Sequence, residues 1–306
     1  MTATQQRSRA SLEELQAAAE AARRGEFALR RPATGAATAA AASAAARIPA
    51  PVAPAPSDTS GWQSGGAVVA VVAGHSGAGA STVAVALAEA LAAAGSNVWI
   101  VEVADASRSG LAGATTAELG EDGTGWRRGR RSGPWGDIHI DRLAFRAAAI
   151  EQVPAPAPAP CPDELLVLDI GWPARDALAA LGWLATALTD CSLLMVCRPT
   201  VPGVRQSEYL LAELAEHSPG SVIVAAVGPA RWPGAATAST GPHLRAARES
   251  GRVITVPIDR RVETDGVSAE ALPKALAAAG KALAAALPST AAHDHLTDQS
   301  ALGRAG

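Results

Sequence analysis

The stretch Gly74-His75-Ser76-Gly77-Ala78-Gly79-Ala80-Ser81-Thr82 decides the fold of this 306-residue chain. It matches the phosphate-loop pattern G-x-x-x-x-G-K-[ST] at every defined position except the lysine, where Ala80 stands. Glycines let such a backbone wrap around a phosphate, while the loop amides and the start of the following helix supply partial positive charge. The Ser81 hydroxyl takes the place that would hold Mg²⁺, and Thr82 would pack beneath the loop.

The sequence on both sides of this loop predicts alternating strands and helices. Ala67–Ala73 is an apolar run as long as a buried strand, and a helix is expected over Ser81–Ala94. Further strands are expected at 97–103, 138–145, 164–170, 192–197, 221–227 and 253–256, and further helices at 174–188, 204–216, 242–250 and 269–287. This order predicts an α/β fold with a mostly parallel sheet and helices on both faces. Residues 106–136 are rich in Gly, Ser and Arg and are expected to form long loops.

Composition divides the chain into one domain and two tails. Residues 66–288 are predicted to fold, whereas 1–65 form a mostly disordered Ala/Pro-rich tail and 289–306 a disordered C-terminal tail. Ser11 and Glu14 fit a capping box, so a short helix is possible at 11–24. That helix could dock on a partner, although a solvated tail with transient helicity is the simpler interpretation.

Bulk composition narrows the class of protein. The net charge of −3 argues against a surface generally adapted to nucleic acid. Cys161, Cys191 and Cys197 are odd in number and lack metal-ligand spacing, which favours a reducing cytoplasm. No run approaches the ~20 apolar residues of a membrane span. The chain has two lysines, Lys274 and Lys281, and neither is close to the phosphate loop in sequence.

The loop and four later segments resemble the ParA/MinD group of dimerising ATPases. His75 stands where that family has its signature lysine, and Ala80 where it has the loop lysine. The later segments are VWIVEVADASRSGLAG at 98–113, LLVLDIGWP at 165–173, CSLLMVCRPTVPGVRQSEYLLAEL at 191–214 and VITVPIDRRVETDGVSAEALPKAL at 253–276. The resemblance implies ATP and Mg²⁺ as cofactors, a homodimer, and a proline-containing loop near the base.

The same resemblance assigns roles to individual residues. Glu102 and Asp105, at and after the end of the second strand, are the catalytic candidates. Ser81 and Asp169 are the metal candidates, although Asp169 could simply end its strand. The predicted nucleotide-binding residues are Gly74, His75, Ser76, Gly77, Ala78, Gly79, Ala80, Ser81 and Thr82.

The absence of the two lysines is expected to lower both the affinity for nucleotide and the rate of hydrolysis. Each lysine would give a charge-assisted contact worth ~1.5–3 kcal/mol, so one loss weakens binding by about ten- to a hundredfold. His75 is a poor replacement because an unperturbed histidine is mostly neutral at neutral pH. Arg108 and Arg198 follow strand ends and could face a nucleotide, or could be solvated surface residues. Hydrolysis is expected to be weak or absent.

A basic run follows Trp126. Arg127, Arg128, Arg130 and Arg131 could make weak, non-specific DNA contacts or touch an acidic partner, while a solvated loop is the plainer interpretation.

Three functions fit these features. The first is a degenerate ParA/MinD-like nucleotide-binding protein that acts through protein partners as a positioning, partition or assembly factor. The second is an active ATPase that uses arginine or a partner's residue in place of the lysine, and the third is a scaffold that binds no nucleotide. A dehydrogenase is disfavoured because Thr82 stands where G-x-G-x-x-G requires its third glycine.

Overall fold

A computed structural model describes residues 66–157, 164–189, 191–217 and 222–288, together with Trp62 and Ser64. The possible helix at 11–24, the C-terminal tail at 289–306 and Cys161 lie outside the described residues. No helix in the described part of the chain is long and apolar enough to cross a membrane.

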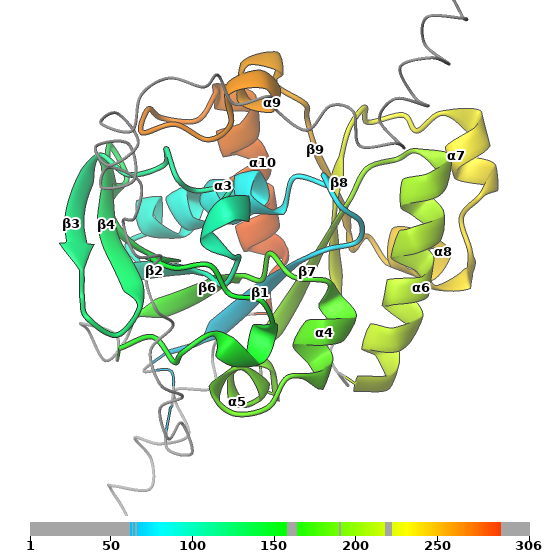
Figure 1. The fold of residues 1–306 in the computed structure, drawn as a ribbon. Coiled ribbons are helices and arrows are strands. Elements are labelled where there is room, and N and C mark those ends of the chain that lie inside the picture. Colours follow the sequence, from blue (N-terminus) through cyan, green and yellow to red (C-terminus); the bar gives the residue numbers. More distant parts are fainter. Residues whose placement is uncertain are drawn as a thin grey trace, which may run out of the picture. The chain divides into compact units, whose positions relative to one another are not determined.

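A nine-stranded sheet with the order β3-β4-β5-β2-β6-β1-β7-β8-β9 forms the centre of the domain (Figure 1). The strands from β5 to β9 in this order pair in parallel, whereas β3 and β4 are antiparallel to their neighbours. The strands are β1 Val68–Ala73, β2 Val98–Glu102, β3 Ala117–Glu121, β4 Trp126–Gly133, β5 Gly136–Leu143, β6 Leu165–Asp169, β7 Ser192–Cys197, β8 Ile223–Val227 and β9 Val253–Val256. The predicted α/β fold with a mostly parallel sheet is confirmed.

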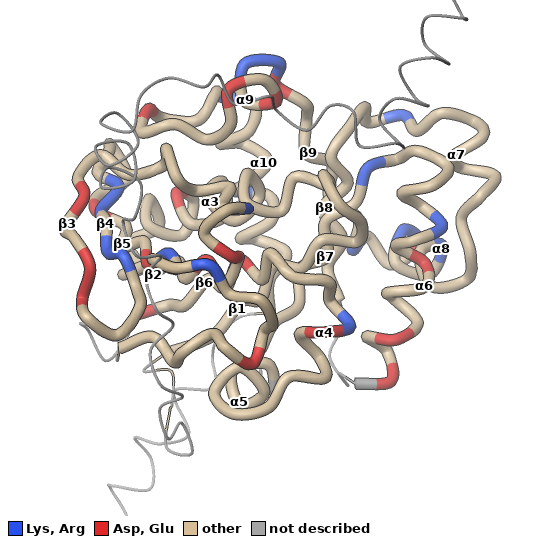
Figure 2. The backbone as a smooth tube through the Cα atoms, viewed as in Figure 1, with Lys and Arg blue, Asp and Glu red and all other residues tan. Residues whose placement is uncertain are grey.

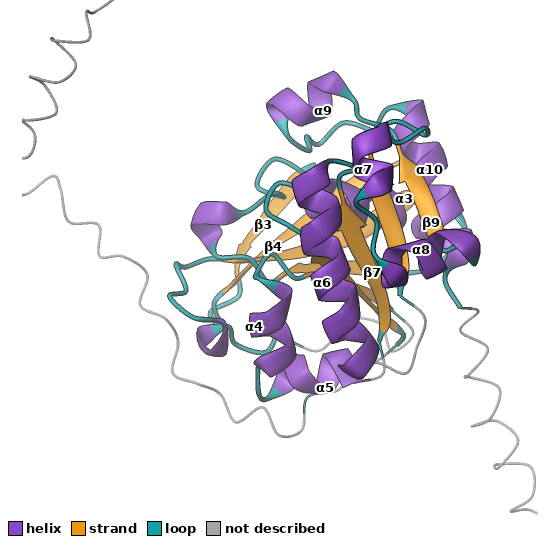
Figure 3. Cartoon of the chain, turned by 90° about the vertical axis from the view of Figure 1, so that its right-hand side faces the viewer, coloured by secondary structure: helices purple, strands orange, loops and turns teal. Residues whose placement is uncertain are grey.

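Helices cover both faces of this sheet (Figure 3). The helices are α3 Ala80–Ala93, α4 Ala174–Ala179, α5 Trp183–Thr189, α6 Val201–His217, α7 Gly234–Ala238, α8 Pro242–Glu249, α9 Arg260–Asp265 and α10 Lys274–Ala286, with 3-10 turns η1 Ala106–Arg108 and η2 Ile150–Gln152. One apolar core holds α3 and α10 against the sheet, and a second core on the other face holds α4, α5, α6, α7 and α8. The parallel strands are buried on both faces, which explains their continuous apolar runs.

The expectation of loops over 106–136 is wrong. The segment contains η1, β3 and β4, and β5 begins at its end. Its turns carry the glycines: Gly123 and Gly125 have φ of 79° and 101°, and the Asp122 side chain accepts hydrogen bonds from Thr124 N (2.8 Å) and Trp126 N (3.3 Å). Strand β4 lacks an apolar alternation because arginines occupy positions that usually hold aliphatic residues.

The basic run is part of this strand and is compensated by acids. Arg127 pairs with Glu121, Arg128 with Asp122 and Asp141, and Arg130 with Asp137. Figure 2 shows acidic and basic segments close together over β3–β5. The interpretation of this run as a loop is therefore corrected, and DNA contact through it is not proposed because little of its charge is unpaired.

Arg131 is a buried residue that links several segments of the domain, and we call its contacts with Glu89 and three backbone carbonyls the Arg131 clamp. Its side chain is fully buried and contacts Glu89 Oε1 through Nε (2.9 Å) and Nη2 (2.6 Å). It also donates to the carbonyls of Ala114, Ser268 and Glu270, which joins β4 to the segment before α10. Burial raises the pKa of Glu89, and Arg131 opposes that rise.

We predict that Arg131→Ala destabilises the protein by about 3–5 kcal/mol, because it leaves the buried Glu89 carboxylate without its partner. Arg130→Ala is the matched control, since Arg130 and Asp137 are about half-exposed, and it should change stability by no more than about 0.5 kcal/mol. Urea unfolding curves measure both, and equal effects of the two changes would contradict the clamp.

Helices α3 and α10 touch backbone to backbone at Gly280. A Cβ at Gly280 would lie 2.0 Å from the carbonyl oxygen of Ala86. A side chain at this position would therefore force the two helices apart.

We predict that Gly280→Ala destabilises the protein by about 1–3 kcal/mol through overpacking, although alanine ordinarily favours a helix by about 1 kcal/mol. Gly234→Ala, at the start of α7 where a Cβ meets nothing, serves as the control and should be neutral or slightly stabilising. A shared gain in thermal midpoint for both variants would show that the helices are not in this close contact.

Candidate functional site

The phosphate-loop candidate connects β1 to α3 at the carboxyl edge of the sheet. Gly77 and Gly79 adopt φ of 73° and 99°, a region that other residues rarely enter. Gly79 is the N-cap of α3, and its carbonyl accepts from Val83 N at 3.1 Å. Gly79, which the motif requires, and Gly77, at one of its variable positions, thus supply the conformational freedom that the loop needs.

His75 is engaged within the protein. Its Nε2 accepts a hydrogen bond from the backbone N–H of Arg198 (3.0 Å), and its Nδ1 lies 2.9 Å from the carbonyl oxygen of Ser76. A backbone N–H only donates and a carbonyl only accepts, so this geometry requires a neutral ring that carries its proton on Nδ1. His75 ties the loop to the end of β7 and does not supply the positive charge of the lysine it replaces.

Glu102 and Asp169 form a buried carboxylate pair at the ends of β2 and β6. They are opposite each other in the strand register, and 0% and 1% of their surfaces are exposed. Burial and the charge of Asp169 raise the pKa of Glu102 to about 7. Burial raises the pKa of Asp169 to about 6, and the nearby Ser81 hydroxyl opposes that rise although it does not come within hydrogen-bonding distance.

The two carboxylates have different surroundings. Glu102 accepts hydrogen bonds from Ser109 Oγ (2.5 Å), Gly110 N (2.6 Å) and Leu111 N (3.1 Å), so it holds the segment that follows η1. In the described part of the chain, neither carboxylate oxygen of Asp169 has a partner within hydrogen-bonding distance. Glu102 is therefore placed as an anchor, and Asp169 is the carboxylate left without a direct partner.

The donor set near Asp169 fits Mg²⁺. A Cβ at Gly110 would lie 2.3 Å from Ser81 Oγ and 3.7 Å from Glu102 Oε1, so the segment held by Glu102 packs directly on the Ser81 hydroxyl. Hydroxyl and carboxylate oxygens are ligands that Mg²⁺ accepts. Among the described residues no group of three or more His, Cys, Asp or Glu side chains could hold a metal. Ser81 and Asp169 would therefore hold Mg²⁺ together with phosphate oxygens and water, as is usual for this ion.

Asp105 and Arg108 belong to the turn η1 that follows β2. The Asp105 carboxylate accepts from Ser107 N at 2.8 Å and caps η1. Burial opposes the ionisation of Asp105, yet its hydrogen bonds with Ser107 prevail and lower its pKa. The Arg108 guanidinium stacks on the Trp172 ring at 4.5 Å, and Trp172 Nε1 donates to Val103 O (2.7 Å). Arg108 therefore packs on an aromatic surface and is not among the residues that line the cavity described next.

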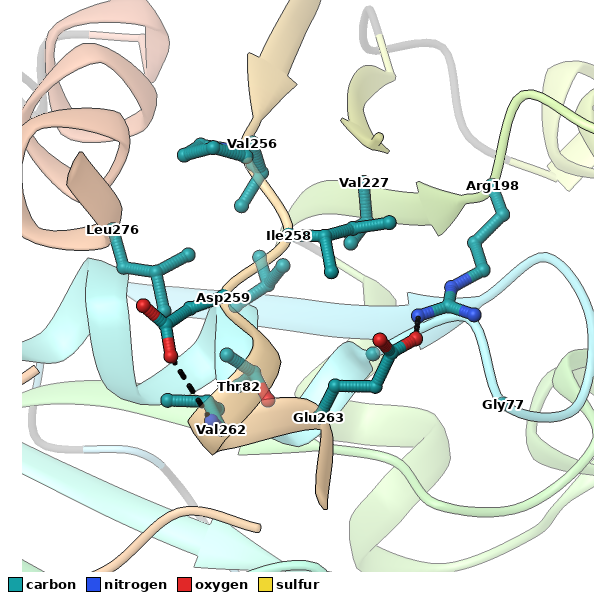
Figure 4. Close-up of a pocket in the computed structure, with 13 residues that line it drawn as sticks. Gly77, Thr82, Arg198, Val227, Val256, Ile258, Asp259, Val262, Glu263 and Leu276 are labelled. Carbon is teal, nitrogen blue, oxygen red and sulfur yellow. Dashed lines mark hydrogen bonds and ion pairs between the residues drawn. The ribbon is translucent and has the colours of Figure 1, made fainter. Parts of the chain in front are cut away.

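A cavity of about 310 Å³ opens next to the loop (Figure 4). Its walls come from the loop and α3, from the ends of β7, β8 and β9, and from α9 and α10. The lining residues are Gly77, Gly79, Thr82, Val83, Arg198, Val227, Val256, Pro257, Ile258, Asp259, Val262, Glu263 and Leu276. Apolar side chains predominate, with charged groups contributed by Arg198, Asp259 and Glu263. This is the composition of a ligand pocket: an apolar lining with few polar groups.

The structure brings part of the predicted site residues together. Gly77, Gly79 and Thr82 line the cavity. Glu102 and Asp169 are opposite each other at the ends of β2 and β6, and Ser81, in the first turn of α3, lies near Asp169. Pro257 belongs to the proline-containing loop that the resemblance placed near a base. The sequence analysis did not single out Glu263 and Ile258. They reach the cavity only because the chain returns to the carboxyl edge of the sheet after β9, and no local sequence pattern predicts that.

No family model matches the sequence, and no curated protein sequence matches it. Among solved structures, the MinD cell division ATPase of Pyrococcus furiosus is similar at 16% identity and a TM-score of 0.43, over 72% of this chain and 98% of that one. A chain of the MinC:MinD cell division protein complex of Aquifex aeolicus has 14% identity and a TM-score of 0.43, over 71% of this chain and 93% of that one. A putative plasmid partition protein of Borrelia burgdorferi bound to AMPPNP has 9% identity and a TM-score of 0.41, over 72% and 97%. These distant likenesses assign no residue roles, which rest on the geometry of this chain.

We predict that Asp169→Asn stabilises the protein in EDTA, and more so at high pH. The pKa of about 6 lies above the ~3.9 of an unfolded aspartate. Folding therefore favours the neutral acid, and this contribution is lost as pH rises from about 4 through about 6. The gain should be small at pH 4.5 and reach about 1–3 kcal/mol at pH 8.

Urea unfolding at the two pH values measures this difference. Asp137→Asn, a change at an exposed carboxylate of β5, is the control and should show little pH-dependent gain. A gain for Asp169→Asn that is independent of pH would contradict a buried, unpartnered carboxylate.

Proposed function

We propose that this protein binds a nucleoside di- or triphosphate with Mg²⁺ and acts through protein partners as a degenerate ParA/MinD-like positioning, partition or assembly factor. The observation that carries the proposal is the loop Gly74–Thr82, set between a buried strand and a helix, with the unpartnered Asp169 beside Ser81 and an apolar cavity alongside. The phosphates would contact the loop amides and the start of α3, and the base would enter the cavity near Pro257.

Mg²⁺ supplies charge neutralisation for the phosphates when it is bound. Ser81 and Asp169 are the residues proposed to hold it. Because Asp169 is buried with free acceptor oxygens, a divalent cation would replace the missing partner and offset the cost of burying its charge. Nucleotide affinity should therefore depend on Mg²⁺.

Weak hydrolysis is part of the proposal. Ala80 offers no cation, and His75 is held neutral by backbone groups. The loop itself therefore lacks the lysine charges that steady a γ-phosphate during transfer in the related chemistry. Asp105 is the other catalytic candidate besides Glu102, and one of its carboxylate oxygens accepts from Ser107 and so organises η1. A nucleotide bound without rapid turnover suits a protein that signals its state to partners.

A protein that binds nucleotide without rapid turnover would act by binding other proteins in its nucleotide-bound state. The solved structures that resemble this fold include the MinC:MinD cell division protein complex of Aquifex aeolicus, in which two different proteins assemble. We propose protein partners and a homodimer for this chain.

An active ATPase is the second candidate function, and one observation favours it. Arg198 lines the cavity with Gly77 and Gly79, so a cation other than lysine is available beside the loop. Measurable Mg²⁺-dependent turnover by the purified chain would support this candidate over a binding protein without hydrolysis.

Isothermal titration of the full chain with ATP, ADP, GTP and GDP, with Mg²⁺ or EDTA, tests the proposal. We expect a Kd on the order of micromolar to tens of micromolar for at least one nucleotide, weaker than a loop with lysine would give by about ten- to a hundredfold. Mg²⁺ should strengthen binding, and Ser81→Ala should remove most of that effect.

Ser132→Ala, at an exposed position of β4 outside the site, is the matched control and should bind like the unchanged chain. Absence of heat with all four nucleotides at millimolar concentration, from a sample with a cooperative thermal transition, would refute nucleotide binding and leave the scaffold function.

A further inference from the structure

Arg198 is the one basic residue among the described residues that line the cavity. It follows β7, and its backbone N–H donates to His75 Nε2 at 3.0 Å, which fixes its position relative to the phosphate loop. Its side chain extends along the cavity that Gly77 and Gly79 also line (Figure 4). The fold thus brings a guanidinium next to the loop from which lysine is missing.

This guanidinium is already occupied by an internal anion. Arg198 Nη2 donates to Glu263 Oε1 at 2.5 Å, and the two side chains face each other in Figure 4. Glu263 comes from α9, more than sixty residues later in the chain, and its side chain is 46% exposed. Arg198 Nε is buried without a partner among the described residues. The ion pair therefore uses the Nη2 donor of the guanidinium and leaves the Nε donor without an acceptor.

We propose that Arg198 is the phosphate-binding cation of this site and that Glu263 is a competing carboxylate which a nucleotide phosphate displaces. This inference rests on the proposed nucleotide site. It adds Arg198 as the residue that compensates for Ala80, and Glu263 as the carboxylate that competes with phosphate for Arg198. A guanidinium presents five donors in a planar fork that suits phosphate oxygens, so a phosphate could also satisfy Arg198 Nε.

The other charged residues near the cavity, Asp259 and Arg261, have partners of their own and make no hydrogen bond or ion pair with Arg198 in the described part of the chain. Asp259 Oδ1 already accepts from Arg261 N (3.0 Å) and Val262 N (3.1 Å), so Asp259 caps α9. Arg261 pairs with Glu270 and does not line the cavity. Among the described residues, Glu263 is thus the carboxylate that contacts the cation of the cavity lining. Removal of its charge frees Arg198 and lowers the repulsion of phosphate, whereas an uncharged nucleoside should respond to neither change.

The test compares a nucleotide with its nucleoside. Kd values are measured for ADP and adenosine, and in parallel for GDP and guanosine, on the full chain and on the Arg198→Gln and Glu263→Gln variants. Arg198→Gln should weaken diphosphate binding by about ten- to a hundredfold, the value of a lost charge-assisted contact. Glu263→Gln should strengthen it by about two- to fivefold, because a partly exposed pair is worth ~0.2–1 kcal/mol.

Nucleoside affinity should stay within about twofold in both variants, since the phosphates are the groups that Arg198 is proposed to contact. Arg261→Gln and Glu270→Gln are matched controls, because they break an Arg–Glu ion pair that involves the same helix but lies outside the cavity lining, and both should leave diphosphate affinity unchanged. Arg198→Lys should restore part of the affinity, because it keeps a charge but not the fork. A thermal transition confirms that each variant is folded.

The outcomes separate this inference from the proposed function. If the unchanged chain binds a diphosphate and Arg198→Gln binds it equally well, the role of Arg198 is overturned while nucleotide binding stands. Unchanged or weaker binding by Glu263→Gln overturns the competing carboxylate. Parallel losses for nucleotide and nucleoside show that Arg198 merely shapes the cavity. No binding of any nucleotide by the unchanged chain or by Glu263→Gln overturns both.

Discussion

The parallel pairing of β1 with both β6 and β7 is the constraint on which the site depends. Parallel strands bring their carboxyl ends to one edge, so the loop after β1 meets Asp169 from β6 and Arg198 from β7. The β2–β6 register then sets Glu102 opposite Asp169. The cavity forms at the same edge because β8, β9 and α9 complete its far wall.

This arrangement holds groups that are costly for the folded protein. Two carboxylates are buried side by side, and the pKa of each is raised, to about 7 for Glu102 and to about 6 for Asp169. Glu102 offsets its burial with hydrogen bonds to the segment after η1, while Asp169 lacks such partners in the described residues. A fold that retains an unsatisfied acid at its centre is expected where a ligand supplies the missing contact. Arg198 is similar in this respect. Its Nε is buried without a partner in the described residues, and a bound ligand could satisfy it.

The parallel core could be predicted from the sequence, and the antiparallel edge could not. Continuous apolar runs such as Ala67–Ala73 indicate buried strands whatever their neighbours, because both faces are covered. Strand β4 has arginines where such runs have aliphatic residues, and only the fold shows that Glu89 neutralises Arg131. The turn Asp122–Gly123 was an available hairpin signal. At the site, the loop and Asp169 follow from local pattern, whereas the Arg198–Glu263 pair joins residues distant in sequence that only tertiary packing brings together.

Amide hydrogen exchange with and without ADP and Mg²⁺ tests the central claim most directly, because it locates the ligand as well as detecting it. The account predicts slower exchange in the loop at 74–83 and in the cavity segment at 256–263, with no change over β3, β4 and β5. Protection confined to the antiparallel edge, or exchange in the loop that saturating ADP leaves unchanged, would contradict a nucleotide site at the carboxyl end of β1.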